Sequence, residues 1–224
     1  EAGQAITRPF RRLAYRDAME RYGVDKPDLR YGFEIRDLTP LVAADAAPFV
    51  RTAIDGGGRV RGIVAAGQAD ASRKEIDALS AAAKDAGAGG LIWAKRTEAG
   101  WEGQGVKAIG AATLEKLGGA TGDLLLAVAG ADAVTSPALH AVRVALTRRP
   151  GVTPSEQHAF CWVVDFPLFE QDPATGAWSP AHHPFTAPHP DDAARLRSEP
   201  WKCRALHYDA VYNGNELGSG SIRI

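Results

Sequence analysis

Short apolar runs alternate with segments of helical periodicity along the middle of the chain. Three of these runs have the length and composition of buried strands, residues 60–65, 91–94 and 124–128. The segments between and after them carry apolar residues three or four positions apart, which is the spacing of one helix face. The alternation predicts a self-contained module of α/β or α+β type over residues 48–150.

Two helices of this module have recognisable ends. Ser72 and Glu75 match the Ser-x-x-Glu pattern of a capping box, and Gly87 follows the last apolar position of the same helix. A second helix is expected to start at Ser136-Pro137, because proline is favoured in a first helical turn. The basic residues that we expect on solvated helix faces are Lys74, Lys84, Arg143 and Arg148.

The two ends of the chain have a different character. Residues 15–22 predict a short amphipathic helix, which Gly23 can end. Residues 161–164 are typical of a strand. Near the C-terminus, Asn213-Gly214 separates two strand-like runs, and this dipeptide is the strongest short signal for a β-hairpin.

The predicted hairpin gathers two carboxylates. If Asn213 and Gly214 form the turn, Asp209 lies opposite Gly218, and the alternation of side chains puts Asp209 and Glu216 on one face. As diagonal neighbours, two carboxylates on one face can chelate a hard divalent ion such as Mg²⁺. The alternative is a pair of solvated carboxylates on an exposed face.

Arg223 raises a question of register. It follows Glu216 by an odd number of residues, so a regular strand would place the two side chains on opposite faces. A one-residue bulge would bring them to the same side, and glycines make the segment Gly218-Ser219-Gly220 suited to one. We predict an irregularity there if both residues serve one site; otherwise Arg223 pairs on the far face.

Composition narrows the function classes. The 26 Lys and Arg against 27 Asp and Glu exclude a nucleic-acid clamp that relies on net charge, although a local basic patch is compatible with them. The apolar runs are far shorter than the roughly 20 residues of a membrane span, so we expect no membrane partner. Cys161 and Cys203 are too few for a disulfide framework, so we expect buried thiols and a cytoplasmic location.

Several catalytic patterns lack their required residues. The glycines at 56–58 are not followed by the Gly-Lys-Ser/Thr of a phosphate-binding loop, and Gly103 and Gly105 lack a third glycine in register. No Gly-x-Ser-x-Gly elbow is present. His182 and His183 are adjacent, and their spacing to other histidines matches no zinc site. One of the two could instead serve an anionic ligand, because histidine gains charge near neutral pH; the alternative is a structural histidine in a turn.

Four segments together resemble one family, the bacterial-type aspartyl-tRNA synthetases. They are residues 21–30, which contain Lys26-Pro27-Asp28, and residues 162–170, 182–188 and 208–224. The resemblance implies an α+β fold: part of a class II antiparallel sheet domain, interrupted by an inserted α/β-type domain similar to the GAD domain of amidotransferase subunits. The implied divisions are residues 1–47 and 151–224 for the catalytic domain and 48–150 for the insertion.

The resemblance also implies a reaction. The α-carboxylate of L-aspartate attacks the α-phosphorus of ATP, and the aspartyl group of the adenylate then passes to tRNA(Asp), in a homodimeric enzyme that uses ATP and Mg²⁺. No side chain is expected to act as a catalytic nucleophile. Arg223 is expected to bind the aspartate side chain, with His182 adding positive charge nearby. Asp209 and Glu216 are expected to bind Mg²⁺, with Glu216 also at ATP. No role is implied for Lys26 or Asp28 beyond a rigid loop.

The chain lacks other parts of that family's pattern. It begins at Glu1 and ends at Ile224 within an expected strand, so we expect a piece of a longer protein that is inactive alone. Two alternatives stay open. One is a non-discriminating relative that also charges tRNA(Asn), and the other is a binding module whose inserted domain contacts tRNA or a partner protein.

Overall fold

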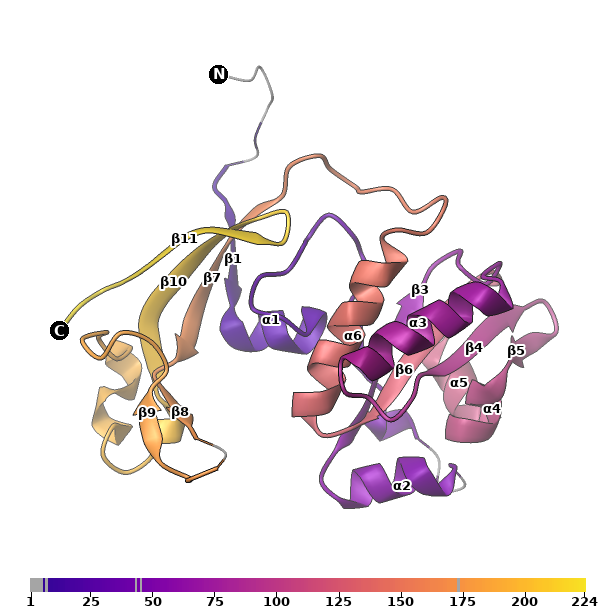
Figure 1. Ribbon diagram of the computed structural model, residues 1–224, viewed down its shortest axis with the longest axis horizontal. Coiled ribbons are helices and arrows are strands. Elements are labelled where there is room, and N and C mark those ends of the chain that lie inside the picture. Colours follow the sequence, from indigo (N-terminus) through magenta and orange to yellow (C-terminus); the bar gives the residue numbers. More distant parts are fainter. Residues whose placement is uncertain (1–5, 7, 43, 45, 173) are drawn as a thin grey trace. The chain divides into compact units, whose positions relative to one another are not determined.

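The computed structural model describes residues 6, 8–42, 44, 46–172 and 174–224. The chain divides into two compact units, both drawn in Figure 1. The larger unit consists of Glu20–Val24 and Tyr31–Thr153, and the smaller unit of Glu1–Met19, Asp25–Arg30 and Pro154–Ile224.

The larger unit is built on a five-stranded sheet of order β2-β3-β6-β4-β5, in which every neighbouring pair is antiparallel. The sequence pattern allowed either an α/β or an α+β fold for this module, and the antiparallel sheet makes it α+β. Its strands are β2 (Ile35–Asp37), β3 (Arg59–Ala65), β4 (Ile92–Thr97), β5 (Gly100–Glu102) and β6 (Leu124–Gly130). Its helices are η1 (Thr39–Leu41), α2 (Pro48–Asp55), α3 (Arg73–Asp85), α4 (Gln104–Ile109), α5 (Ala111–Leu117) and α6 (Asp132–Leu146).

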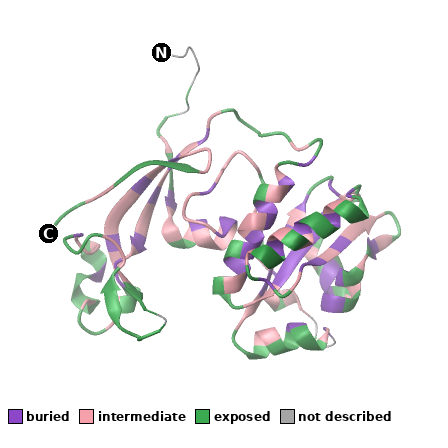
Figure 2. Cartoon of the chain, viewed as in Figure 1, coloured by how far each residue is buried: buried purple, intermediate pink, exposed green. Residues whose placement is uncertain are grey.

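Helices cover both faces of this sheet, which makes three layers. On one face, Leu124 and Leu126 of β6 join the buried residues of α3 and α6 in one core cluster. On the other face, Leu125 of β6 joins those of α2, α4 and α5 in a second cluster. Burial on both sides explains why β6 is a continuous apolar run, and its purple ribbon in Figure 2 marks this centre.

The ends of α3 follow the sequence prediction. The Ser72 side chain accepts a hydrogen bond from the Glu75 backbone N–H, and the Glu75 carboxylate accepts one from the Ser72 backbone N–H at 2.8 Å. The helix ends at Asp85, and Gly87 follows with a φ of 99°. The capping box and the glycine stop are both confirmed.

The predicted start of α6 at Ser136-Pro137 is wrong. The helix begins at Asp132, so Pro137 lies inside it, where it cannot donate a hydrogen bond to the carbonyl of Ala133. Packing compensates for this loss, because Leu139, Val142 and Leu146 are fully buried against the sheet. Tertiary contacts therefore decide the boundary that local propensity misplaced.

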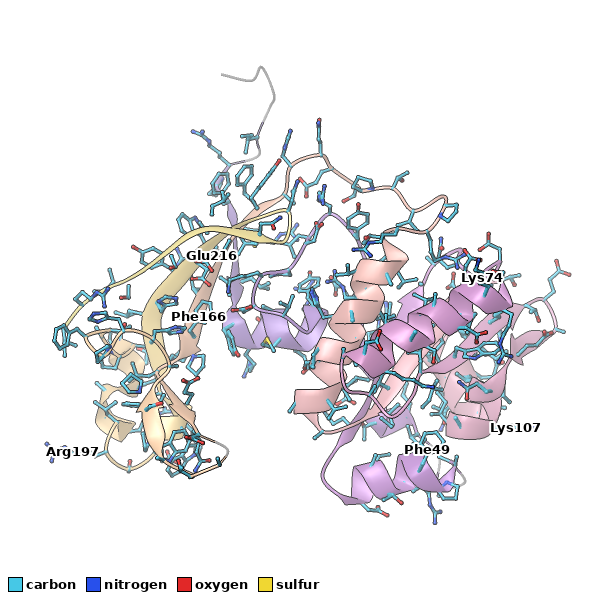
Figure 3. All side chains as sticks on the ribbon, viewed as in Figure 1. Phe49, Lys74, Lys107, Phe166, Arg197 and Glu216 are labelled. Atoms are coloured by element: carbon cyan, nitrogen blue, oxygen red, sulfur yellow. The ribbon has the colours of Figure 1, made fainter. Side chains whose placement is uncertain are left out.

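Arg143 is a second correction. Lys74, Lys84 and Arg148 are exposed as predicted, and Lys74 projects from α3 in Figure 3, but Arg143 is buried. Its guanidinium donates a hydrogen bond to the Phe33 carbonyl at 2.5 Å and lies 4.8 Å from the centre of the Tyr22 ring. Backbone carbonyls in the loop before β2 need donors, and this arginine provides them.

The larger unit starts earlier in the chain than residue 48. Ile35, Arg36 and Asp37 pair with β3, so residues 31–47 contribute an edge strand and η1 to its sheet. Pairing between β2 and β3 decides this boundary, and the hydrophobic pattern of the chain does not report it. The identity of residues 48–150 as an inserted GAD-like domain stays a proposal.

The smaller unit is built on a four-stranded sheet of order β1-β7-β10-β11. The β1–β7 pair is parallel, and the other two pairs are antiparallel. Its strands are β1 (Arg11–Ala14), β7 (Phe160–Pro167), β8 (Phe169–Gln171), β9 (Trp178–Pro180), β10 (Arg204–Tyr212) and β11 (Asn215–Ser221). Its 3-10 helices are η2 (Pro190–Arg195) and η3 (Pro200–Lys202), and α1 (Tyr15–Tyr22) runs from this unit into the larger one.

Both cysteines are buried free thiols, as predicted. Burial raises the pKa of Cys161 to about 11, so this thiol is protonated and unreactive at neutral pH. In the part of the chain that the structure describes, no helix has the length and apolar character to cross a membrane.

Candidate active site

The C-terminal hairpin turns at Asn213 and Gly214, as predicted. Their φ angles are 49° and 80°, the left-handed values of a type I′ turn. The Asn213 side-chain oxygen accepts a hydrogen bond from the Ala159 N–H at 2.9 Å, which ties the turn to the start of β7. A Cβ on Gly214 would lie 3.2 Å from the Asp28 Cβ, so the loop of residues 25–30 packs closely against the turn.

A bulge follows this turn in β11. Val211 pairs with Glu216, but Ala210 pairs with Gly218, so Leu217 is an extra residue. Asp209 consequently lies opposite Ser219 and not opposite Gly218, the partner expected of a regular ladder. The predicted irregularity is present, one residue nearer the turn, and Asp209 and Glu216 are diagonal neighbours on one face.

The bulge also decides the side of the sheet on which Arg223 lies. His207 pairs with Ser221, so alternation places Arg223 on the face that carries His207 and Asp209. Arg223 itself bridges to Thr186, in the segment that follows His182. The structure therefore brings the hairpin carboxylates, Arg223 and the His182 segment to one side of the sheet.

Asp209 is buried, with a side chain only 4% exposed. Its Oδ1 atom lies 3.0 Å from Nε2 of His207, two residues earlier on the same strand. Its Oδ2 atom lies 3.5 Å from the Lys26 ammonium. Each carboxylate oxygen thus has a polar partner, which buried carboxylates require.

Lys26 connects both hairpin carboxylates. Its Nζ atom lies 3.3 Å from Glu216 Oε2 and 2.8 Å from Asp25 Oδ2, besides its contact with Asp209. Burial lowers the pKa of Lys26, but the hydrogen bonds to Asp25 and Glu216 and the charges of Asp25 and Asp209 outweigh burial and raise the pKa above its ordinary value. The Glu216 side chain is 36% exposed, and Figure 3 labels this residue on β11.

Asp209 and Glu216 both lie next to the Lys26 ammonium, so their positions show whether the two carboxylates suit a divalent cation. Carboxylates of Asp209 and Glu216 approach the same positive charge, and Mg²⁺ in proteins is commonly held by one or two carboxylates together with substrate phosphates. The pair therefore fits such an ion. Among the residues that the structure describes, no group of three or more His, Cys, Asp and Glu side chains is arranged as a complete metal centre.

His182 is positioned by aromatic contacts. Its ring stacks on His207 with centroids 3.8 Å apart and packs edge-on against Phe166 at 5.1 Å. Burial, followed by the neighbouring imidazole of His207, lowers the pKa of His182. Its Nε2 atom is buried and has no hydrogen-bond partner in the described part of the chain. The adjacent His183 is exposed and accepts a hydrogen bond from the Phe185 N–H.

Sequence reasoning missed His207 and Lys26 as members of this group. His207 was detectable, because a residue two positions before Asp209 on a strand lies on the same face. The role of Lys26 was not detectable from local pattern, because its loop and the hairpin are far apart in sequence. Asp28 pairs with Arg30 at 2.7 Å within that loop, consistent with a rigid structural element.

Comparison with known families gives one match, which covers residues 1–224: tRNA synthetases class II (D, K and N). Curated relatives are similar over almost the whole chain. The "Aspartate--tRNA(Asp/Asn) ligase" of Heliobacterium modesticaldum is 45% identical over 226 residues, which are 99% of this chain and 37% of that protein. The ligase of the same name from Caldanaerobacter subterraneus subsp. tengcongensis is 42% identical over 220 residues, 96% of this chain and 37% of that protein.

A third relative with that name, from Moorella thermoacetica, is 44% identical over 226 residues, 99% of this chain and 38% of the relative. The chain thus spans between a third and two fifths of the length of these curated relatives.

Proposed function

Since this chain belongs to the class II tRNA synthetases of the D, K and N group, we propose that it is part of an aspartate–tRNA ligase. Such an enzyme activates L-aspartate with ATP and transfers the aspartyl group to tRNA(Asp). The names of the relatives support this assignment. Because the chain spans only about 37% of their length, we assign the activity to a longer protein and expect these 224 residues alone to be inactive.

The bulged hairpin is the observation that supports the proposal best. Asp209 and Glu216 lie on one face, and the extra residue Leu217 brings Arg223 to the same side. Two acids and one guanidinium suit a substrate pair that consists of a carboxylate and a nucleotide with its divalent ion. A regular ladder would have separated Arg223 from the two acids.

The proposed reaction needs positioning more than it needs a protein nucleophile. The α-carboxylate oxygen of aspartate forms a bond to the α-phosphorus of ATP while the bond to pyrophosphate breaks, and the product is aspartyl-adenylate. Arg223 offers a planar, two-pronged donor to the side-chain carboxylate of aspartate. The same guanidinium disfavours asparagine, whose amide NH₂ would face a group that can only donate.

Asp209 and Glu216 would hold Mg²⁺, which when bound neutralises charge on the ATP phosphates. His207 orients the Asp209 carboxylate through its contact with Oδ1. His182 presents its unpartnered Nε2 atom beside this group. We assign it to the aspartate site, where an anionic substrate would favour its charged form against the effect of burial.

The choice of tRNA is a finer proposal. The curated relatives carry "(Asp/Asn)" in their names, which supports an enzyme that also charges tRNA(Asn). A function of the inserted domain in binding tRNA or a partner protein has no comparable support, and we retain the ligase as the proposed function.

The test is aspartate-dependent exchange of pyrophosphate into ATP by the full-length protein that contains this chain. Arg223→Ala should lower kcat/KM for aspartate by about 10²- to 10³-fold, because it removes a charge-assisted contact to the substrate. The KM for ATP should change little. Discrimination between aspartate and asparagine should narrow in the same variant.

Arg197→Ala is the matched control. Arg197 is exposed and, as Figure 3 shows, projects away from the ribbon of the smaller unit. Its removal should leave exchange unchanged. Full exchange activity in Arg223→Ala would refute the assignment of the aspartate site, and no exchange in the wild-type full-length protein would refute the ligase.

A further inference from the structure

The Lys26 side chain lies where three carboxylates converge. Its Nζ atom is 2.8 Å from Asp25 Oδ2, 3.3 Å from Glu216 Oε2 and 3.5 Å from Asp209 Oδ2. Two of these three carboxylates are the ones that we assign to a divalent ion. The third belongs to the residue next to Lys26 in the same loop.

The arrangement gives Lys26 a task in the absence of a metal ion. The side chain of Asp209 is almost fully buried, and a buried carboxylate without a compensating charge is strongly unfavourable. The lysine ammonium supplies that charge from a loop that packs against the hairpin turn. Its side chain is itself 31% exposed, so the flexible arm has room to move.

A divalent ion and the ammonium cannot share these two carboxylates. An ion coordinated by Asp209 and Glu216 would lie within a few ångströms of Nζ, where two positive charges repel each other. Asp25 already binds the ammonium, at the shortest of the three contacts, and does not belong to the hairpin, so it can keep the ammonium when the hairpin carboxylates are occupied. The loop therefore contains both the competing cation and its alternative partner.

We propose that Lys26 is a tethered counter-cation, which neutralises Asp209 and Glu216 when no metal is bound and withdraws from them, held by Asp25 alone, when a divalent ion occupies them. The proposal rests on the proposed function for the assignment of the two carboxylates. It adds that Lys26 weakens the binding of the free ion. Binding then depends on further ligands such as the phosphates of ATP, so the ion and the nucleotide enter together.

The experiment measures Mn²⁺ binding to the chain by electron paramagnetic resonance, without ATP, aspartate or tRNA. Lys26→Met keeps the length of the side chain and removes its charge. We expect Mn²⁺ to bind this variant at least about tenfold more tightly than the wild type, because the competing charge is gone. We also expect the metal-free variant to melt at a lower temperature than the wild type, and added Mn²⁺ to raise its melting temperature by more.

Two further variants locate the effect. Lys202→Met is the matched control, because Lys202 pairs with Glu199 on η3 and contacts neither hairpin carboxylate. It should leave the Mn²⁺ affinity unchanged. Glu216→Gln, combined with Lys26→Met, should abolish the increase in Mn²⁺ affinity.

Asp25→Asn supplies a test that does not depend on how Lys26→Met folds. This variant keeps the ammonium but removes the carboxylate that holds it when it leaves the hairpin, so Mn²⁺ should bind more weakly than to the wild type. Mn²⁺ binding that is unchanged or weaker in Lys26→Met, including no detectable binding to either protein, would overturn the proposal. Since the measurement needs no catalysis, its failure is distinct from failure of the exchange assay that tests the ligase.

Discussion

At the scale of single residues, the buried carboxylates of Asp192 and Asp209 in the smaller unit are held by cationic partners. Asp192 is the clearest case outside the candidate site. Its side chain is 3% exposed, and Oδ2 accepts hydrogen bonds from the Arg204 backbone N–H at 2.9 Å and from Arg204 Nε at 2.8 Å. The hydrogen bonds from the Arg204 side chain lower the pKa of Asp192 to about 2.

This lowered pKa predicts a pH-dependent contribution to stability. The unfolded carboxyl titrates near pH 4, so the contribution is fully present above that value and disappears as the pH falls through about 2. Asp192→Asn should lower the free energy of unfolding by about 1–3 kcal/mol at pH 7. The difference from the wild type should shrink toward pH 2, as measured by urea unfolding at several pH values.

Asp191→Asn provides the comparison. Asp191 is 74% exposed and lies 3.5 Å from Arg204, so its removal should change stability by less than about 0.5–1 kcal/mol. An equal loss in both variants, or a loss in Asp192→Asn that persists unchanged at pH 2, would contradict the buried ion pair as the cause.

Whether a residue of the candidate site could be predicted from the sequence depends on how far along the chain its partners lie. Asp209 and Glu216 were placed on one face from the turn and the alternation alone, because both act within one hairpin. Lys26 was not, because its contact depends on a loop about 180 residues earlier in the sequence that packs on this hairpin. The stack of His182 on His207 likewise joins a loop to a strand, and no local pattern reports it.

At the scale of elements, ends with specific capping chemistry are predictable, and ends set by packing are not. The capping box at Ser72 and the turn at Asn213 follow from hydrogen bonds within a few residues. The start of α6 and the short helix α4 depend on buried contacts with the sheet, and the sequence prediction misplaced the first and missed the second. Strand β6 was predictable because it is buried on both faces.

Ser72→Ala tests the capping box. The variant removes the acceptor for the Glu75 N–H and should lower the free energy of unfolding by about 1 kcal/mol. Chemical denaturation monitored by circular dichroism measures this loss. Ser80→Ala, within the same helix, is the control and should be neutral or slightly stabilising, because alanine has the higher helix propensity. A similar loss in both variants would exclude capping as the cause.

At the scale of the whole molecule, the two units have separate interiors. Both large apolar clusters lie entirely within the larger unit, whereas the candidate site is built from the smaller one. The family match over the full chain does not by itself report this division. We therefore expect the two units to differ in their response to a core substitution.

Leu126→Ala makes that expectation measurable. Leu126 is fully buried in β6, and its truncation should cost the larger unit about 2–5 kcal/mol. Hydrogen exchange should then accelerate at the amides of β3, β4 and β6, while the amides paired between β7 and β10 keep their protection. Equal acceleration in both sheets would mean that the units unfold together.

The extra residue in β11 has a consequence for how this segment can change. Replacing Leu217, whose side chain is 61% exposed, leaves the number of residues between Glu216 and Arg223 intact, so most substitutions there preserve the site. Removing Leu217 gives a regular ladder in which Gly218 and the residues after it keep their present partners. Glu216 and Arg223 are then an even number of residues apart, so Arg223 stays on the face of the two acids. The bulge thus absorbs one residue of length. The site tolerates a change or even the loss of Leu217, whereas a residue inserted after Gly218 would shift every later pair by one and turn Arg223 to the opposite face.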